Sequence, residues 1–194
     1  MKKIAIFASG SGTNAQRIIE YFRNHPEIKV ELIFSNNPKA YVLERAKLLN
    51  VESVVFTRDD FYKTDKVQMI LREKQIDFIV LAGFLWLIPE YILDTYNGKI
   101  INIHPALLPK YGGKGMYGML VHEAVIQSGD QESGITIHHV NKNYDEGQII
   151  FQAKCPVDPD DTPLSLATKI HQLEYACFPK VIESVILNKE LISN

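Results

Sequence analysis

The sequence predicts an α/β fold with a mostly parallel central sheet of about seven strands, and two patterns support that prediction. Short runs rich in Ile, Val and Phe alternate with longer amphipathic stretches, as they do in repeated βα units. The first four apolar runs are nearly continuous, which favours parallel strands covered on both faces. The last two runs are joined by a short turn, which favours an antiparallel C-terminal part.

Each apolar run defines an expected strand, and each amphipathic stretch defines an expected helix. Pro179 falls inside the last helix, where it has no amide N–H to donate, so we expect it to kink or break that helix. The expected strands are 3–8, 30–34, 53–56, 78–82, 99–103, 134–140 and 148–157, and the expected helices are 14–24, 40–49, 66–74, 89–96, 116–128 and 163 to about 187.

The composition is that of an ordinary globular protein. The chain has 194 residues, of which 46% are hydrophobic and 23% are charged, so we expect one well-buried domain over residues 1–194. The net charge of -2 and the lack of a dense Lys/Arg run argue against a nucleic-acid-binding surface. A small anionic substrate suits this charge better.

The sequence also predicts a cytoplasmic location. The apolar run near the N-terminus ends at Ser9, which is too short for a signal peptide, and no segment approaches the length of a membrane span. Cys155 and Cys177 lack metal-like spacing and lie in apolar stretches, so we interpret them as reduced thiols that pack in the interior. A disulfide between them is the alternative.

The segment Asn102-Ile103-His104-Pro105 is the most informative part of the chain. Asn102 and His104 are two residues apart, so their side chains leave a strand on one face. Pro105 cannot donate to a sheet and keeps His104 extended, which places the pair at a strand end, where α/β proteins bind ligands. An amide beside an imidazole suits addition of a nucleophile to an acyl carbon. The alternative is a capped turn in which both side chains satisfy backbone groups.

A second polar group follows later in the chain. Thr136 and His138 share one face of a strand, and Asp145 lies in the polar loop after it. If that strand neighbours the one ending at His104, an amide, two imidazoles and a carboxylate converge, and the carboxylate can favour an imidazolium and relay a proton. A metal site built from His104, His138 and His139 is the competing interpretation, although His138 and His139 point to opposite faces of a strand.

Residues 9–14, Ser-Gly-Ser-Gly-Thr-Asn, connect the first strand to the first helix. Small residues there let backbone N–H groups surround an anion at the helix N-terminus, so we interpret the loop as a phosphate site. It lacks the lysine of a P-loop and the third glycine of the dinucleotide-binding motif. A plain strand-to-helix turn is the alternative.

Residues 81–89, Leu-Ala-Gly-Phe-Leu-Trp-Leu-Ile-Pro, form an apolar loop after the fourth strand, at the same sheet edge. Such a run can line a pocket for a flat aromatic ligand. The alternative is ordinary hydrophobic core.

Together these motifs resemble the folate-dependent formyltransferases over essentially the whole chain. Asn102-x-His104-Pro105 is typical of that superfamily, whereas Gly10-x-Gly12-Thr13-Asn14 and His171-x-x-Glu174 resemble its glycinamide ribonucleotide branch. The resemblance implies a Rossmann-like three-layer formyltransferase fold, with a phosphate-binding half at 1–100 and a catalytic and folate-binding half at 101–194.

The resemblance further implies a reaction. The formyl group of 10-formyltetrahydrofolate would pass to the amine of N1-(5-phospho-D-ribosyl)glycinamide in de novo purine biosynthesis, by direct amine attack and without a metal. Asn102 would hold the formyl oxygen, His104 would stabilise or protonate the oxyanion, and Asp145 would steer the amine proton through water to the folate nitrogen. His138 and Thr136 would support these three residues from behind.

The resemblance also implies the binding residues and the partners. The ribonucleotide phosphate would lie on Gly12, Thr13 and Asn14, with Glu174 near the ribose hydroxyls. The two small-molecule substrates would be the partners of a monomer or weak homodimer, without nucleic acid or membrane. The folate would contact Leu85, Trp86, Leu87, Ile88, Asn102 and Asp145.

Two features depart from the family pattern. Trp86 stands where many relatives carry arginine, which argues against a salt bridge from this position to the glutamate tail of the folate. Residues 110–116, Lys-Tyr-Gly-Gly-Lys-Gly-Met, are richer in glycine than the usual loop, which indicates a mobile flap.

Three rival functions share parts of the pattern. Formyl transfer to methionyl-tRNA or an amino sugar nucleotide would use the same Asn102, His104 and Asp145, as would a deformylating hydrolase with water as the nucleophile. We expect the tRNA enzymes and the hydrolases to carry further domains that 194 residues cannot hold. A nucleotide-binding module without catalysis is the third rival.

Overall fold

The computed structural model describes residues 1–191. Its strands form a mixed sheet of seven in the order β3-β2-β1-β4-β5-β6-β7. The elements are β1 (Lys2–Phe7), α1 (Thr13–Phe22), β2 (Ile28–Ser35), α2 (Val42–Leu48), β3 (Glu52–Val55), α3 (Arg58–Tyr62), α4 (Lys66–Glu73), β4 (Phe78–Leu81), α5 (Glu90–Thr95), β5 (Ile100–His104), α6 (Met119–Ser128), β6 (Glu132–His139), β7 (Ile149–Pro156) and α7 (Pro163–Leu187).

The chain divides into two compact units, Met1–Ile101 and Asn102–Asn194, and the division falls within β5. Each unit has its own buried residues. The expectation of a single domain over residues 1–194 stays a prediction.

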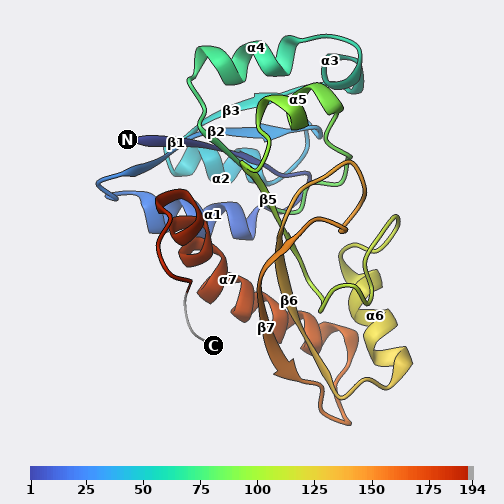
Figure 1. Ribbon diagram of the computed structural model, residues 1–194. Helices are drawn as coiled ribbons and strands as arrows, with labels where there is room; N and C mark the ends of the chain where they lie inside the picture. Colours follow the sequence, from blue (N-terminus) through green and yellow to red (C-terminus); the bar gives the residue numbers. More distant parts are fainter. Residues whose placement is uncertain (192–194) are drawn as a thin grey trace. The chain divides into compact units, whose positions relative to one another are not determined.

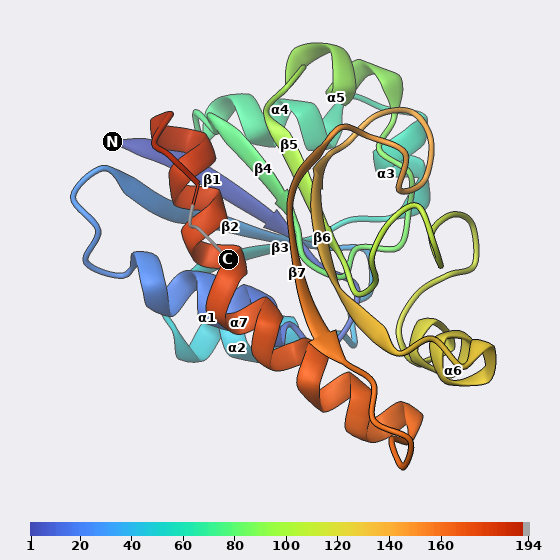
Figure 2. The same ribbon diagram turned by 60° about the horizontal axis from the view of Figure 1, so that its bottom comes forward.

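The first unit is a parallel α/β structure. β1 pairs in parallel with β2 on one side and with β4 on the other, and β2 pairs in parallel with β3. Figures 1 and 2 show α1 and α2 on one face of these strands and α3, α4 and α5 on the other. Because both faces are covered, Ile4–Phe7 are buried whichever way their side chains point. This confirms the interpretation of the first apolar runs as parallel strands.

The second unit contains an antiparallel pair. β6 pairs with β7 in antiparallel register, as the short connecting turn predicted. α7 packs against both strands and also contacts α6. It begins with a capping box, in which Thr162 and Ser165 satisfy each other's backbone N–H groups, and Pro163 occupies the first helical position.

The predicted strands are all present, and their ends agree within two residues. The helix α6 begins at Met119 rather than at 116, because Gly118 before it has a left-handed φ of 57°. The short helix α3 was not predicted, although Thr57 and Asp60 form a capping box at its start. Pro179 was expected to kink or break α7. The helix runs through Pro179 without a break, and Figure 2 shows its axis changing direction in the C-terminal part, as a kink requires.

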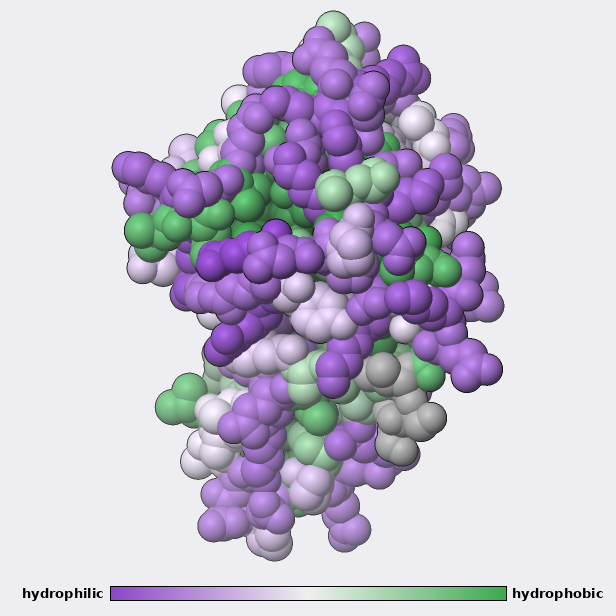
Figure 3. All heavy atoms as spheres, turned by 90° about the vertical axis from the view of Figure 1, so that its left-hand side faces the viewer, coloured by the Kyte–Doolittle hydropathy of each residue, from purple (hydrophilic) through white to green (hydrophobic). Residues whose placement is uncertain are grey.

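Aromatic rings fill the core of the first unit. The rings of Phe7 and Phe34 are stacked with their centroids 4.7 Å apart, and both side chains are fully buried. Phe56 and Phe61 contact the Phe7 ring from other segments. Outside such cores the surface is mixed: hydrophilic residues dominate the face drawn in Figure 3, and hydrophobic residues appear there in smaller groups.

We expect Phe34→Ala to destabilise the protein by about 3–5 kcal/mol, because it removes a ring that is fully enclosed by other rings. The free energy of unfolding from a denaturant titration measures the effect. Leu48→Ala is the control, because Leu48 is 75% exposed, and its stability should stay within about 0.5 kcal/mol of the wild type. Equal losses in the two variants would contradict this description of the core.

Candidate active site

Strand β5 ends at His104, and Asn102 lies two residues earlier on the same face. Pro105 follows directly and has no N–H to continue the ladder. Asn102 is half-buried and His104 is buried. The strand-end position predicted for this pair is therefore confirmed.

Four side chains of the second unit meet at this strand end: those of Asn102, His104, His138 and Asp145. Nδ2 of Asn102 donates to Oδ1 of Asp145 at 3.5 Å and lies 3.1 Å from Nε2 of His138. Nδ1 of His104 is 3.5 Å from Oδ2 of Asp145, and Nε2 of His138 is 3.6 Å from Oδ1. The predicted convergence required β5 and β6 to be neighbours, and the strand order makes them so.

Asp145 is the charged group at the centre of this cluster. Its backbone is left-handed, with a φ of 56°, and its Oδ2 accepts the N–H of Gly113 at 3.0 Å. Burial by itself raises the pKa of the Asp145 carboxyl, but the hydrogen bond from His138, the charge of His104 and the Gly113 amide together lower that pKa below its usual value. The carboxylate is thus ionised at neutral pH and available to receive a proton.

The His104 ring lies between two acceptors. Nε2 is 2.7 Å from the main-chain carbonyl of Tyr111, so this nitrogen carries a proton and donates it there. Burial lowers the pKa of His104, and the Asp145 carboxylate and the Tyr111 carbonyl offset only part of that effect. Negative charge that develops beside the ring will therefore increase its proton affinity from a low starting value.

The His138 ring is fixed by the backbone beside it. Nδ1 is 2.8 Å from the carbonyl of His139, so Nδ1 carries the proton and Nε2 faces Asn102 and Asp145. A Cβ atom at Gly147 would collide with that same carbonyl, so the turn after Asp145 requires glycine there.

Thr136 acts on the backbone that follows His104. Its hydroxyl donates to the carbonyl of Ala106 at 2.7 Å and accepts the N–H of Leu108 at 3.0 Å. Nε2 of Gln152 donates to the same hydroxyl at 2.8 Å. Thr136 therefore fixes the segment after β5 through these bonds.

In the first unit, the loop 9–14 leads into α1. Gly12 precedes the helix with a left-handed φ of 73°, and Thr13 and Asn14 begin its first turn. A Cβ atom at Gly12 would lie 2.8 Å from Cα of Val42 and closer still to its side chain. On the outer side, Nε of Arg45 donates to the carbonyl of Ser11 at 2.8 Å. The loop thus has one fixed conformation at a helix N-terminus, as an anion site requires.

The loops 9–14 and 81–89 are joined by one serine. The N–H of Ser9 donates to the carbonyl of Gly83 at 3.0 Å, and the N–H of Leu85 donates to Oγ of Ser9 at 3.1 Å. The predicted phosphate loop and the predicted folate loop are therefore held in one arrangement within the first unit.

The apolar loop is partly core and partly surface. Phe84 and Ile88 are buried, Trp86 and Leu87 are half-buried, and Leu85 is exposed. The interpretation of this segment as hydrophobic core is thus correct for Phe84 and Ile88. The side chain of Leu85 is exposed and available to a ligand.

Trp86 belongs to an aromatic group in the first unit. Its ring contacts the rings of Phe56, Phe61, Tyr62 and Phe84. The guanidinium of Arg58 lies over the Trp86 ring, 5.5 Å from its centroid. Arg58 of α3 therefore lies beside Trp86, the position at which many relatives carry arginine.

Comparison with known proteins agrees with this arrangement. The sequence pattern of the formyl transferase family matches residues 2–182. The phosphoribosylglycinamide formyltransferase of Haemophilus influenzae is 38% identical over 188 residues, which are 94% of this chain and 86% of that protein. This chain belongs to the phosphoribosylglycinamide formyltransferase family.

Solved structures of phosphoribosylglycinamide formyltransferases share the fold. The Streptococcus pneumoniae structure is 40% identical with a TM-score of 0.84, covering 96% of this chain and 99% of that one. A glycinamide ribonucleotide transformylase from Symbiobacterium toebii is 30% identical with a TM-score of 0.89, covering 100% of this chain and 92% of that one. The Rossmann-like, mostly parallel fold implied by the sequence resemblance is confirmed.

Other expectations for this phosphoribosylglycinamide formyltransferase family member remain open. Within residues 1–191, no group of His, Cys, Asp or Glu is arranged to hold a metal ion, and no helix is long and apolar enough to cross a membrane. Cys155 and Cys177 are free thiols. Reaction without a metal, the monomer or weak homodimer, and the cytoplasmic location stay predictions.

The sequence missed two backbone contacts of the site. The Tyr111 carbonyl and the Gly113 amide bind His104 and Asp145, and main-chain groups carry no signature of residue type. Glu174, the residue predicted for ribose binding, lies buried on α7 in the second unit. The mobility predicted for 110–116 stays a prediction.

We expect Gly12→Ala to lower the free energy of unfolding by roughly 1–3 kcal/mol, because the new methyl group meets Val42 and the backbone must leave its left-handed conformation. Gly10→Ala is the matched control in the same loop, because no atom lies within 4 Å of its added Cβ. Denaturant titration measures both variants. A destabilised Gly10→Ala with an unchanged Gly12→Ala would refute the loop geometry.

His122 predicts how stability depends on pH. It is 3% exposed on α6, and among the described residues its Nδ1 has no hydrogen-bond partner. Burial, together with the charges of His171 and His104, lowers the pKa of His122 to about 4. The unfolded chain binds this proton near pH 6.5, so acid favours the unfolded chain.

We therefore expect His122 to remove up to about 3 kcal/mol of stability as the pH falls from 6.5 toward 4. His122→Gln should lose this component, so its free energy of unfolding should decline less steeply with acid than that of the wild type. Denaturant titrations across this pH range give both curves. Parallel curves would show that His122 titrates normally in the folded protein.

Proposed function

We propose that the protein transfers the formyl group of 10-formyltetrahydrofolate to the amine of N1-(5-phospho-D-ribosyl)glycinamide in de novo purine biosynthesis. The observation that carries the proposal is the cluster of Asn102, His104, His138 and Asp145 at the end of β5, in a chain of the phosphoribosylglycinamide formyltransferase family. An amide, an imidazole and an ionised carboxylate that converge at a strand end, with shifted pKa values, are the groups that acyl transfer requires.

The reaction has two steps that the protein can assist. The amine nitrogen attacks the formyl carbon, so negative charge develops on the formyl oxygen. The bond from that carbon to N10 of the folate then breaks, and N10 takes up a proton while the attacking nitrogen loses one. Stabilising the oxygen and moving the proton are the steps that side chains can accelerate.

Asn102 and His104 suit the oxygen. The amide N–H group of Asn102 is a neutral donor beside the carboxylate, and we assign it to the formyl oxygen. Burial lowers the pKa of His104, but negative charge on the formyl oxygen favours the charged ring, and an imidazolium beside that oxygen would stabilise it. Its proton would be the one that the attacking amine loses, passed through Asp145 to Nδ1 and finally to N10 of the folate. Donors that are fixed in place before the reaction stabilise the transition state at little cost, because they need not reorganise as the charge develops.

Asp145 suits the proton. Its carboxyl has a lowered pKa despite burial, because the interaction with His138, the charge of His104 and the Gly113 N–H favour the ionised form. An ionised carboxylate can receive a proton from the attacking amine and return it to the leaving nitrogen through water. Thr136 and His138 keep the surrounding backbone and imidazole in position.

The binding assignments follow from the two loops of the first unit. We assign the ribonucleotide phosphate to Gly12, Thr13 and Asn14, because the loop presents backbone N–H groups at the start of α1. Glu174 is assigned to the ribose hydroxyls. The folate is assigned to Leu85, Trp86, Leu87 and Ile88, together with Asn102 and Asp145.

The deciding experiment measures tetrahydrofolate released from 10-formyltetrahydrofolate by the purified protein, with and without the ribonucleotide. We expect release only when the ribonucleotide is present. Release without it would indicate a hydrolase, and no release under either condition would overturn the proposal. Adding methionyl-tRNA or an amino sugar nucleotide as the acceptor tests the two other transferases.

We expect Asp145→Asn to lower kcat by about a hundredfold or more, because it keeps the shape of the side chain but removes the proton acceptor. Glu146→Gln is the matched control: its carboxylate is exposed, accepts from Asn143 at 2.6 Å and should be dispensable. Steady-state rates at saturating substrates measure both variants. If Glu146→Gln were the inactive one, the assignment of Asp145 would be wrong.

A further inference from the structure

The Tyr111 carbonyl makes the closest polar contact of the His104 ring. It lies 2.7 Å from Nε2, whereas the Asp145 carboxylate lies 3.5 Å from Nδ1. The orientation of the ring therefore depends first on a main-chain carbonyl seven residues further along the chain. A hydrogen bond at this distance from an imidazole to a carbonyl is well formed.

The backbone around Tyr111 does not hold that carbonyl by itself. Tyr111 has a left-handed φ of 56°, a conformation that costs free energy for a side chain of this size. Gly112 and Gly113 follow it, and glycine lowers the resistance of the chain to rearrangement. Other contacts must stabilise this conformation.

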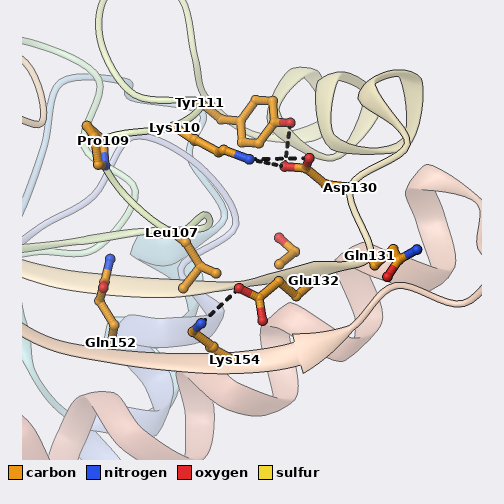
Figure 4. Close-up of a pocket in the computed structure, with 10 residues that line it drawn as sticks. Leu107, Pro109, Lys110, Tyr111, Asp130, Gln131, Glu132, Gln152 and Lys154 are labelled. Atoms are coloured by element: carbon orange, nitrogen blue, oxygen red, sulfur yellow. Dashed lines mark hydrogen bonds and ion pairs between the residues drawn. The ribbon is translucent and has the colours of Figure 1, made fainter.

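The Gly113 N–H bond to Asp145 is one such contact, and the side chain of Tyr111 supplies others at Tyr111 itself. Its hydroxyl lies 2.9 Å from Oδ2 of Asp130 and 2.5 Å from Oγ of Ser128, where α6 ends. Nζ of Lys110 donates to both oxygens of the same Asp130 carboxylate, at 3.0 and 3.3 Å. Figure 4 shows Lys110 and Tyr111 directed at Asp130 from neighbouring positions. We call Lys110, Tyr111, Ser128 and Asp130 the Tyr111 clamp.

Polar contacts join the members of the clamp. Lys110, Tyr111 and Asp130 help to line an open cavity of about 330 Å³, and the Lys110 side chain is 65% exposed. The hydrogen bonds from Lys110 and Tyr111 lower the pKa of Asp130, so its carboxylate is charged at neutral pH. A charged acceptor strengthens the bond from the Tyr111 hydroxyl.

We propose that Tyr111 is a positioning residue for His104: its hydroxyl, fixed by Asp130 and Ser128, holds its own main-chain carbonyl on Nε2 of the imidazole. This inference rests on the proposed function for its catalytic meaning and on the contacts alone for its geometry. Ser128 and Asp130, at the end of α6 and just after it, thereby influence the orientation of the His104 ring. They bond to the Tyr111 hydroxyl and not to the ring itself.

The proposal has a consequence for proton affinity. The carbonyl accepts the Nε2 proton and favours the imidazolium, so it raises the pKa of His104 against the larger lowering by burial. The other titratable groups that act on the ring are Asp145, His138 on β6 and His122 on α6. All three stay in place when only the Tyr111 hydroxyl is removed.

The first test is Tyr111→Phe, which removes only that hydroxyl. The pKa of His104, followed by NMR of its imidazole nitrogens, should fall relative to the wild type, because the carbonyl is no longer held against Nε2. kcat should fall about tenfold with little change in KM, since a small misplacement of a reacting group costs rate steeply. The limb of the kcat–pH profile that reports His104 should move to lower pH by the same amount.

Tyr91→Phe is the matched control, because it also removes a single tyrosine hydroxyl that makes a hydrogen bond. The Tyr91 hydroxyl donates to the main-chain carbonyl of Phe61 at 2.8 Å rather than to a residue of the clamp. It should leave the His104 titration and kcat unchanged. Asp130→Ala should reproduce the effect of Tyr111→Phe, and the double variant should be no worse than either single one. Circular dichroism confirms that each variant is folded.

An unchanged His104 titration in both Tyr111→Phe and Asp130→Ala would overturn the proposal, as would additive effects in the double variant. A merely structural role for Tyr111 would lower stability without moving the His104 pKa. The titration needs no turnover, so it decides this inference even if wild-type protein fails to form tetrahydrofolate, a failure that would refute the proposed function instead.

Discussion

A carboxylate that leaves water must be surrounded by donors or it takes up a proton, and Asp145 imposes that constraint on the second unit. The groups around it come from three separate segments: Asn102 and His104 from β5, His138 from β6, and Gly113 from the loop after β5. Asn102 and Gly113 donate N–H groups to the carboxylate. Each of these groups must be in place for the charge to persist. The Asp145 carboxylate thus connects three features of the second unit: the pairing of its strands, the turn between β6 and β7, and the path of the 110–116 loop.

The same constraint explains which parts of the site could be predicted from the sequence. Asn102 and His104, like Thr136 and His138, are separated by two residues, and side chains at that spacing share one face of a strand. Pro105 marks the strand end because it lacks an N–H. Such signals are local, so they survive without knowledge of the fold. The near-continuous apolar runs correctly predicted the parallel pairing of the first strands, whereas the adjacency of β5 and β6 that brings the site residues together was only a condition of the prediction.

Other features of the structure depend on tertiary packing. For these the sequence either carries no local signal or carries one that packing overrides. The Tyr111 carbonyl contacts His104, but every residue has a carbonyl, so nothing in the sequence distinguishes this one. Pro179 does not end α7, because the buried contacts along this helix outweigh the loss of one backbone hydrogen bond. Arg58 was not associated with Trp86, because the two residues lie on different segments and meet only through the folding of α3. The side chains of the site, including the supporting Thr136 and His138, are therefore visible in the sequence, whereas the main-chain groups that orient His104 and Asp145 are not.

A single residue, Ser9, joins the loop after β1 to the loop after β4. Its N–H and hydroxyl bind the carbonyl of Gly83 and the N–H of Leu85, so the loop after β1 and the loop after β4 share two hydrogen bonds through one residue. β1 and β4 are paired neighbours in parallel register, so their C-terminal ends lie side by side and a single small side chain can reach across. A larger residue at position 9 would fill this space, and an alanine would leave the Leu85 amide without its acceptor. Ser9 thus links the C-terminal ends of two adjacent parallel strands, whichever ligand each loop binds.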